Sequence, residues 1–240
     1  TPSDLTVVIG NKDVLLLEST RIMDELPWPA FRSMVTELSP GDGFGSASSA
    51  STVHMAQEGD TSTHRTFTVC CTSATASRHN TPTRPDQIWQ YCKKQLVGPA
   101  RKGKSIGILL VIPRLADAFP SACAVARAFP QWRAKTGKES HPYRVRLEVV
   151  CTEGPVPECL LAECQAAGTS IELATAIGDM PPSVLNVDRY VQLVEHLSQT
   201  LGFELTCHRG VALQRMGLNG IYDVGKAATE APALLVCSKR

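Results

Sequence analysis

The sequence lacks the short patterns that identify several common classes of site. Its 240 residues contain no C-x-x-C pair, no H-E-x-x-H motif and no N-x-S/T glycosylation acceptor. The six histidines never pair at i, i+4, so no single helix face could hold zinc through two of them. A zinc ribbon, a zincin-type peptidase site and a glycosylated surface therefore have no support in the sequence.

An excess of one charge and a long apolar run are also missing. The formal net charge is +1, so electrostatics do not predict nucleic acid or an acidic membrane surface as partner. The longest apolar run, Ile106–Ile112, is far shorter than the roughly 20 residues that cross a bilayer. The first residues, TPSDLTVVIG, lack the basic start of a secretory signal. We expect a cytoplasmic protein, with a mitochondrial location as the alternative.

Cysteine, by contrast, is abundant. There are nine, an odd number, and most lie in apolar segments such as FTVCCTS and LLVCS. This placement is typical of reduced cysteines that serve as small core residues. A metal or disulfide framework is the alternative.

Strands and helices alternate along the first two thirds of the chain. A continuous apolar run at 106–112 is typical of a strand buried on both faces. We predict strands at 5–9, 14–17, 51–55, 66–71, 106–112 and 145–151, and helices at 28–38, 85–97 and 121–129. This order predicts an α/β sandwich with a largely parallel or mixed sheet. We expect residues 1–155 to form this amino-terminal domain.

A linker helix and a second α/β unit are predicted to follow. The linker spans 156–179, and Gly168 in its middle predicts a kink or break. Residues 180–240 contain a strongly amphipathic helix, with Asn186 as its N-cap and Gly202 as its stop. Strands at 203–207 and 233–237 flank a short helix at 212–216. So few elements cannot bury both faces of a sheet, so we expect this unit to need more polypeptide.

Two glycine motifs are weak signals for nucleotide binding. Residues 98–105 spell G-x-x-x-x-G-K-S, but a helix is predicted before them and a strand after them. A phosphate-binding loop requires the opposite order, because the amino terminus of the following helix holds the phosphates. Gly41, Gly43 and Gly45 likewise follow a helix. We interpret both segments as connections, and no residue of the chain is predicted to be catalytic, cofactor-binding or metal-binding.

Four segments resemble the leucyl aminopeptidase family. NGIYDVGKAATEAPALLVCSKR, from Asn219, is similar to the family's stretch before the catalytic sheet, and IGDMPPSVLNVDRYVQLVEHLSQTLGFELTC to its N-T-P-P-N segment, helix and first catalytic strand. ASRHNTPTRP and FPSACAVARAFPQW resemble the branch known as probable aminopeptidases. The resemblance spans residues 65–240. The sequence departs from the family pattern at Gly178–Ser183, where N-T-P-P-N is expected, at Asn219-Gly220 and at Ala231-Pro232.

The resemblance implies an activity that this chain does not itself complete. In the family, two divalent metals, zinc or manganese, activate water to cleave amino-terminal residues from peptides. Their ligands lie in V-G-K-G-x-x-x-D-x-G-G and N-T-D-A-E-G-R motifs, which we expect downstream of residue 240. Lys226 lies in VGKAA, but no D-x-G-G follows it, so no catalytic role is transferred. The resemblance also implies a homohexamer.

Two functions follow from this interpretation. In the first, the chain is the amino-terminal part of an active metalloaminopeptidase, has structural or oligomerisation roles, and meets peptide only through a catalytic portion elsewhere. In the second, it is a catalytically inactive relative that serves as a structural subunit of a larger assembly. A small-molecule-binding or nucleotide-binding α/β domain is a more distant alternative.

Overall fold

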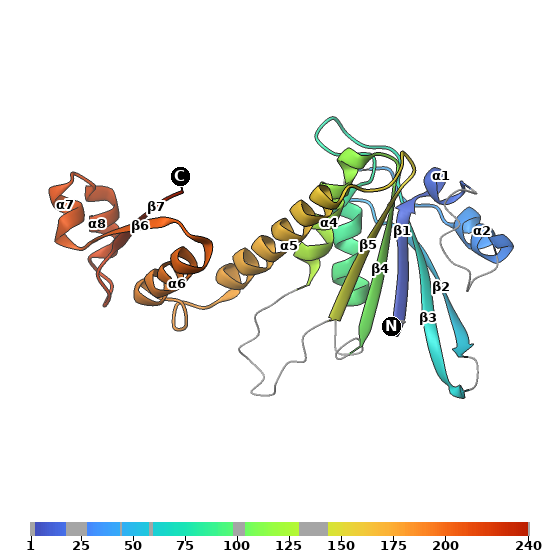
Figure 1. Cartoon of the computed structure of the whole chain (residues 1–240), viewed down its shortest axis with the longest axis horizontal. Coiled ribbons are helices and arrows are strands. Elements are labelled where there is room, and N and C mark those ends of the chain that lie inside the picture. The colour runs from blue at the N-terminus through green and yellow to red at the C-terminus, as the bar shows by residue number, and fades with distance from the viewer. Residues whose placement is uncertain are drawn as a thin grey trace. The chain divides into compact units, whose positions relative to one another are not determined.

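The chain divides into two compact units in a computed structural model, and each is described by itself (Figure 1). The first unit is Thr1–Ala176 and the second is Ile177–Arg240. The structure describes residues 3–17, 28–43, 45–57, 60–97, 104–129 and 144–239.

The first unit is built on a five-stranded mixed sheet. Its strands are β1 (Leu5–Asn11), β2 (Ser49–Gln57), β3 (Asp60–Thr72), β4 (Ser105–Ile112) and β5 (Arg144–Cys151), in the order β2-β3-β1-β4-β5. β1 pairs in parallel with both β3 and β4, β4 pairs in parallel with β5, and only β2 runs antiparallel to its neighbour. The prediction of an α/β fold with a mixed sheet is confirmed.

Helices cover both faces of this sheet and create two apolar cores. α1 (Lys12–Leu15) and α2 (Trp28–Glu37) pack on one face. The other face carries α3 (Pro85–Tyr91), the π-helical segment η2 (Cys92–Leu96), the 3-10 turn η4 (Leu115–Asp117), α4 (Ala118–Ala128) and α5 (Glu158–Asp179). β4 is buried from Ile106 to Ile112 except at Gly107, as a strand covered on both faces must be.

The strand predicted at 14–17 is wrong, because the chain turns into the helix α1 at this point. The Oδ1 atom of Asn11 accepts a hydrogen bond from the backbone N–H of Val14 at 2.9 Å, which is the bond of a helix N-cap. Val14 and Leu15 are buried against the sheet from this helix. The N-cap at Asn11 therefore stabilises a helix at 12–15, although the apolar run that begins at Val14 has a composition typical of a strand.

The break predicted at Gly168 is also wrong, since α5 continues through it from Glu158 to Asp179. A β-carbon built on Gly168 would lie 3.7 Å from the Cβ of Ala126 in α4. Two small residues thus meet where these helices pack. A contact of 3.7 Å is ordinary van der Waals contact, so alanine would also fit here, and the roughly 1 kcal/mol that glycine costs does not interrupt the helix.

The second unit contains three helices and a two-stranded antiparallel sheet. Its elements are α6 (Val187–Leu201), β6 (Glu204–Arg209), α7 (Val211–Arg215), α8 (Asn219–Gly225) and β7 (Ala233–Ser238). The side chain of Asn186 accepts a bond from the N–H of Arg189 at 3.0 Å, and Gly202 ends α6 at φ +68°. Both predicted ends of α6 are confirmed, whereas α8 had no sequence prediction.

Within the part of the chain that the structure describes, no helix has the length and apolar character to cross a membrane.

Candidate functional site

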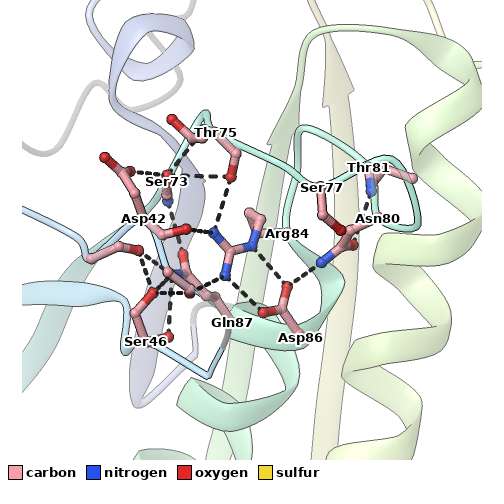
Figure 2. A network of polar contacts seen from close by, with 12 residues as sticks. Asp42, Ser46, Ser73, Thr75, Ser77, Asn80, Thr81, Arg84, Asp86 and Gln87 are labelled. Carbon is pink, nitrogen blue, oxygen red and sulfur yellow. Dashed lines mark hydrogen bonds and ion pairs between the residues drawn. The ribbon is translucent and has the colours of Figure 1, made fainter.

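The carboxyl ends of the parallel strands are where ligands usually bind in an open α/β sheet. The favoured position lies between two neighbouring strands whose following connections run to opposite faces of the sheet. Here β1 leads to α1 and α2 on one face, and β3 leads to α3 on the other. A dense polar network lies in this region, in the loop after β3 and the first turn of α3 (Figure 2).

Arg84 is the centre of this network. Its Nε and Nη2 atoms donate to the two carboxylate oxygens of Asp86 at 3.0 and 2.9 Å. Nη1 donates to the backbone carbonyls of Asp42 at 3.2 Å and Thr75 at 3.0 Å, and Nη2 donates to that of Gly43 at 3.2 Å. These bonds use all five N–H groups of a guanidinium. With 3% of its side chain exposed, Arg84 has no donor left for a ligand.

The same residue carries the one left-handed backbone conformation outside glycine among the described residues, at φ 53°. An L side chain is strained there, by about 1–3 kcal/mol. Pro85 follows and disfavours the ordinary helical conformation for the residue before it. The carbonyl of Arg84 still accepts bonds from the N–H groups of Gln87 and Ile88, so the strained residue starts α3.

The electrostatics of the pair stabilise both charges. The hydrogen bonds from Arg84 hold the pKa of the Asp86 carboxyl below its ordinary value, against the opposing effect of burial. The Nδ2 atom of Asn80 also donates to Asp86 at 2.8 Å and acts in the same direction. The same pair raises the pKa of Arg84. Both groups are therefore ionised at neutral pH and neither is poised to exchange a proton.

Gln87 fastens two loops to the start of α3. Its side chain is fully buried, and its Oε1 atom accepts the N–H of Ser73 at 2.8 Å. Its Nε2 atom donates to the carbonyls of Gly41 at 2.8 Å and Ser46 at 3.2 Å. The Ser73 hydroxyl in turn donates to the carboxylate of Asp42. The network thus fills the usual ligand position with the protein's own side chains and acts as a structural clamp.

Side chains suited to catalysis are dispersed. Among the described residues, no group of three or more His, Cys, Asp or Glu side chains could hold a metal ion. The Nδ1 atom of His54 lies 3.2 Å from the hydroxyl of Thr66, and the Nε2 atom of His79 accepts a bond from Arg78. His196 is exposed on α6, as its position opposite the apolar stripe predicts. His141 and the side chain of His64 lie outside the described residues.

Lys226 lies in an ordinary surface environment. Its Nζ atom donates to the carboxylate of Asp223 at 2.7 Å, and both side chains are more than half exposed. This hydrogen bond raises the pKa of Lys226. No further carboxylate is paired with it in the described part of the chain, so the residue has the surroundings of a surface ion pair.

The elements on either side of both glycine motifs come in the predicted order. The described Lys104 precedes β4, and η2 ends at Leu96, so a helix comes before the G-x-x-x-x-G-K-S segment and a strand after it. Gly98–Gly103 lie outside the described residues. The carboxylate of Asp4 accepts hydrogen bonds from both the hydroxyl and the backbone N–H of Ser105. This serine joins the starts of two parallel strands.

The second unit has an exposed apolar surface. Large apolar side chains are exposed on α6, on and after α7, on α8 and on β7, with Val224 at 84%. The other members of this set are Val184, just before α6, and Tyr190, Leu201, Val211, Met216, Ile221 and Val236. A groove of about 300 Å³ lies between α6 and β7 and is lined by apolar residues of both. β7 is a nearly continuous apolar strand, ALLVCS, of the kind found inside sheets that are covered on both faces.

Comparison with known sequences finds one family and several relatives. Residues 12–138 match the profile described as M17 aminopeptidase N-terminal domain 2. The human protein named probable aminopeptidase NPEPL1 is 32% identical over 180 residues, which cover 71% of this chain and 33% of that protein. Leucine aminopeptidase 1 of Caenorhabditis elegans is 27% identical over 163 residues, covering 68% and 32%.

Comparison with solved structures finds the same fold. Leucyl aminopeptidase from Trypanosoma brucei, in complex with actinonin, superposes with a TM-score of 0.79 at 25% identity over 97% of this chain and 44% of its own. Leucyl aminopeptidase from Leishmania major gives 0.80 at 23% identity, covering 100% and 45%. The bottromycin maturation enzyme BotP, in complex with Mn, gives 0.57 at 16% identity. The chain spans about a third of the length of the curated relatives and under half of these structures.

Proposed function

Because this chain belongs to the M17 aminopeptidase family and contains its amino-terminal domain, we propose that the whole protein is a metal-dependent aminopeptidase. In this proposal residues 1–155 form a non-catalytic domain, 156–179 form the linker, and 180–240 form the first segment of the catalytic domain. The chain itself supplies structural and oligomerisation surfaces. Peptide binds only to the catalytic portion.

The apolar surface of the second unit carries the proposal. Its eight exposed large apolar side chains belong to a unit whose described residues include three buried hydrophobic ones, Val191, Val194 and Leu213. β7 has an apolar sequence suited to the middle of a sheet but pairs with β6 alone. Such a strand is stabilised when further strands and helices cover it. The related structures contain more than half of their polypeptide beyond the aligned part, which is enough to do so.

The metals would be held by that further polypeptide. The described residues offer no ligand set, so no step of the reaction is assigned to this chain. We propose two divalent metals, zinc or manganese, by resemblance to the family, and the BotP complex with Mn supports the second choice. A homohexamer and a cytoplasmic location are proposed on the same resemblance.

The experiment is to isolate the protein from its natural source and to measure two properties. The first is its intact mass, and the second is hydrolysis of leucine p-nitroanilide with and without added Mn²⁺ or Zn²⁺. We expect either a polypeptide that extends well beyond residue 240 or a second polypeptide bound to the chain. We also expect hydrolysis that a chelator abolishes. A lone chain that ends at residue 240 with no partner and no activity would refute the proposal.

The second candidate, an inactive structural subunit, is favoured by one departure from the family pattern. Gly178–Ser183 stands where the family has N-T-P-P-N, at the start of the proposed catalytic segment. Its signature in the same experiment is a longer polypeptide or a stable assembly that hydrolyses nothing with any added metal.

A further inference from the structure

A second candidate site lies beside the Arg84 network. We name it the Trp89 groove. It has a volume of about 610 Å³ and lies among α3, α4 and α5. Its principal lining residues are Pro85, Trp89, Pro120, Ala124, Arg127 and Ile171. The volume is within the roughly 300–1,000 Å³ typical of small-molecule pockets, and the walls are mainly apolar.

Two cations lie over the ring of Trp89: Arg127, which lines the groove, and Lys93, which does not. The Nζ atom of Lys93 lies 4.8 Å from the ring centroid of Trp89, and the Cζ atom of Arg127 lies 5.4 Å from it. A cation over an indole face is favourable, but two cations that share one ring repel each other. Among the described residues, neither Lys93 nor Arg127 has an ion-pair partner. An anion near both would convert this repulsion into attraction.

The one acidic residue of the lining does not neutralise them. Both carboxylate oxygens of Asp86 accept bonds from Arg84, and one also accepts a bond from Asn80. Its charge is therefore matched within the clamp, and the charge available to a ligand in the groove is positive. The groove combines apolar walls with an unmatched positive edge.

The local backbone gives a second indication of a binding site. Lys93 lies in η2, a π-helical turn that directly continues α3. A π-helical turn is rarer and less stable than an α-helical one, and such turns are retained most often at functional sites. Here the turn belongs to the segment that presents Lys93 to the ring.

We propose that the Trp89 groove binds an organic carboxylate with an apolar body. The carboxylate lies near Lys93 and Arg127, and the body lies against Trp89, Pro120 and Ile171. The carboxylate belongs either to a small free acid or to the carboxyl terminus of a peptide, because both present the same chemistry. This site lies within the first unit and is independent of the proposed peptidase activity.

The test is calorimetric titration of the chain with N-acetylphenylalanine, with its neutral amide, and with the peptide N-acetyl-Ala-Ala-Phe. All three have a blocked amino group, so no aminopeptidase can hydrolyse them. We expect saturable binding of the free acid with a dissociation constant of about 1 mM or tighter, and binding of the amide about tenfold weaker. Tighter binding of the peptide identifies a peptide terminus as the source, and binding of the free acid alone identifies a small molecule.

Matched variants place the binding in the groove. Lys93→Gln and Arg127→Gln should each weaken binding of the acid several-fold, since each removes one of the two charges. Lys94→Gln removes the same charge from the neighbouring exposed position, which lies over no aromatic ring among the described residues and faces a different cavity, and should leave binding unchanged. Equal binding of acid and amide, equal effects of Lys93→Gln and Lys94→Gln, or no saturable binding of any probe would overturn the proposal.

Discussion

Replacing Arg84 with alanine should destabilise the first unit more than any other single change in the loop after β3. The substitution removes both bonds to Asp86 and the bonds to three backbone carbonyls. Removing one partner of a buried ion pair costs about 3–5 kcal/mol, because the other charge loses its counter-ion. Asp86 is 27% exposed and keeps its bond from Asn80, so water and Asn80 compensate in part. We therefore expect a loss near the lower limit, about 3 kcal/mol.

Urea unfolding followed by tryptophan fluorescence measures this loss selectively. Trp28, Trp89 and Trp132 all belong to the first unit, so the signal does not depend on the second. At a slope of about 2 kcal/mol per molar urea, the midpoint should fall by about 1.5 M. Arg78→Ala is the matched control, because Arg78 is exposed in the same loop and its side chain hydrogen-bonds only to the neighbouring His79 among the described residues. We expect the control to change stability by less than about 0.5 kcal/mol.

A double-mutant cycle separates the ion pair from the carbonyl contacts. Asp86→Ala alone leaves the guanidinium without its counter-ion, and the double variant leaves neither charge. If the pair is coupled as its geometry indicates, the double variant should lose about 2 kcal/mol less than the sum of the single losses. Additive losses, or an Arg84→Ala variant as stable as Arg78→Ala, would refute the assignment of the network as the clamp of this unit.

Three further predictions concern the same unit. The folded-state pKa of Asp86 is lowered, so its ionised carboxylate contributes fully to the free energy of unfolding above the unfolded pKa of about 4. That contribution is lost as the pH falls through the folded-state pKa. In acid titrations, wild-type stability should therefore drop more steeply below about pH 4 than the stability of Asp86→Asn. Gly10→Ala should cost about 1–3 kcal/mol in urea unfolding, since its β-carbon would lie 2.8 Å from the carbonyl oxygen of Val111, whereas Gly43→Ala, with open space around it, should be nearly neutral. Thr72→Val should leave the thermal midpoint unchanged or raise it, because the hydroxyl of Thr72 is buried with no hydrogen-bond partner in the described structure; a clear fall would show that it has one.

Local signals in the sequence determined most of the elements. The apolar run at 106–112 became the buried strand β4, and the amphipathic stripe after Asn186 became α6 with the predicted N-cap and stop. These features depend on side-chain periodicity and capping chemistry, which act over a few residues. The four family-like segments likewise identified the family, because their residues are contiguous in the chain.

The failures have a different cause. The run at 14–17 has strand-like composition, but the bond from Val14 to Asn11 and burial against the sheet made it helical. Gly168 is unfavourable in an isolated helix, but α5 continues through it and packs on the core of the first unit. In both positions contacts between separate elements, or a cap set by the end of β1, outweighed local propensity.

Only the tertiary structure decided which polar residues form a site. Arg84 is an ordinary arginine in the sequence, and its role follows from the carbonyls of Asp42 and Gly43, some forty positions earlier, which the fold brings to it. The pairing of Lys93 and Arg127 around Trp89 likewise needs α3, η2 and α4 to be packed together. The sequence by itself determined the family and most helices and strands, because these depend on residues that are close together in the chain. The clamp and the groove depend on distances between elements, which only the packed chain defines.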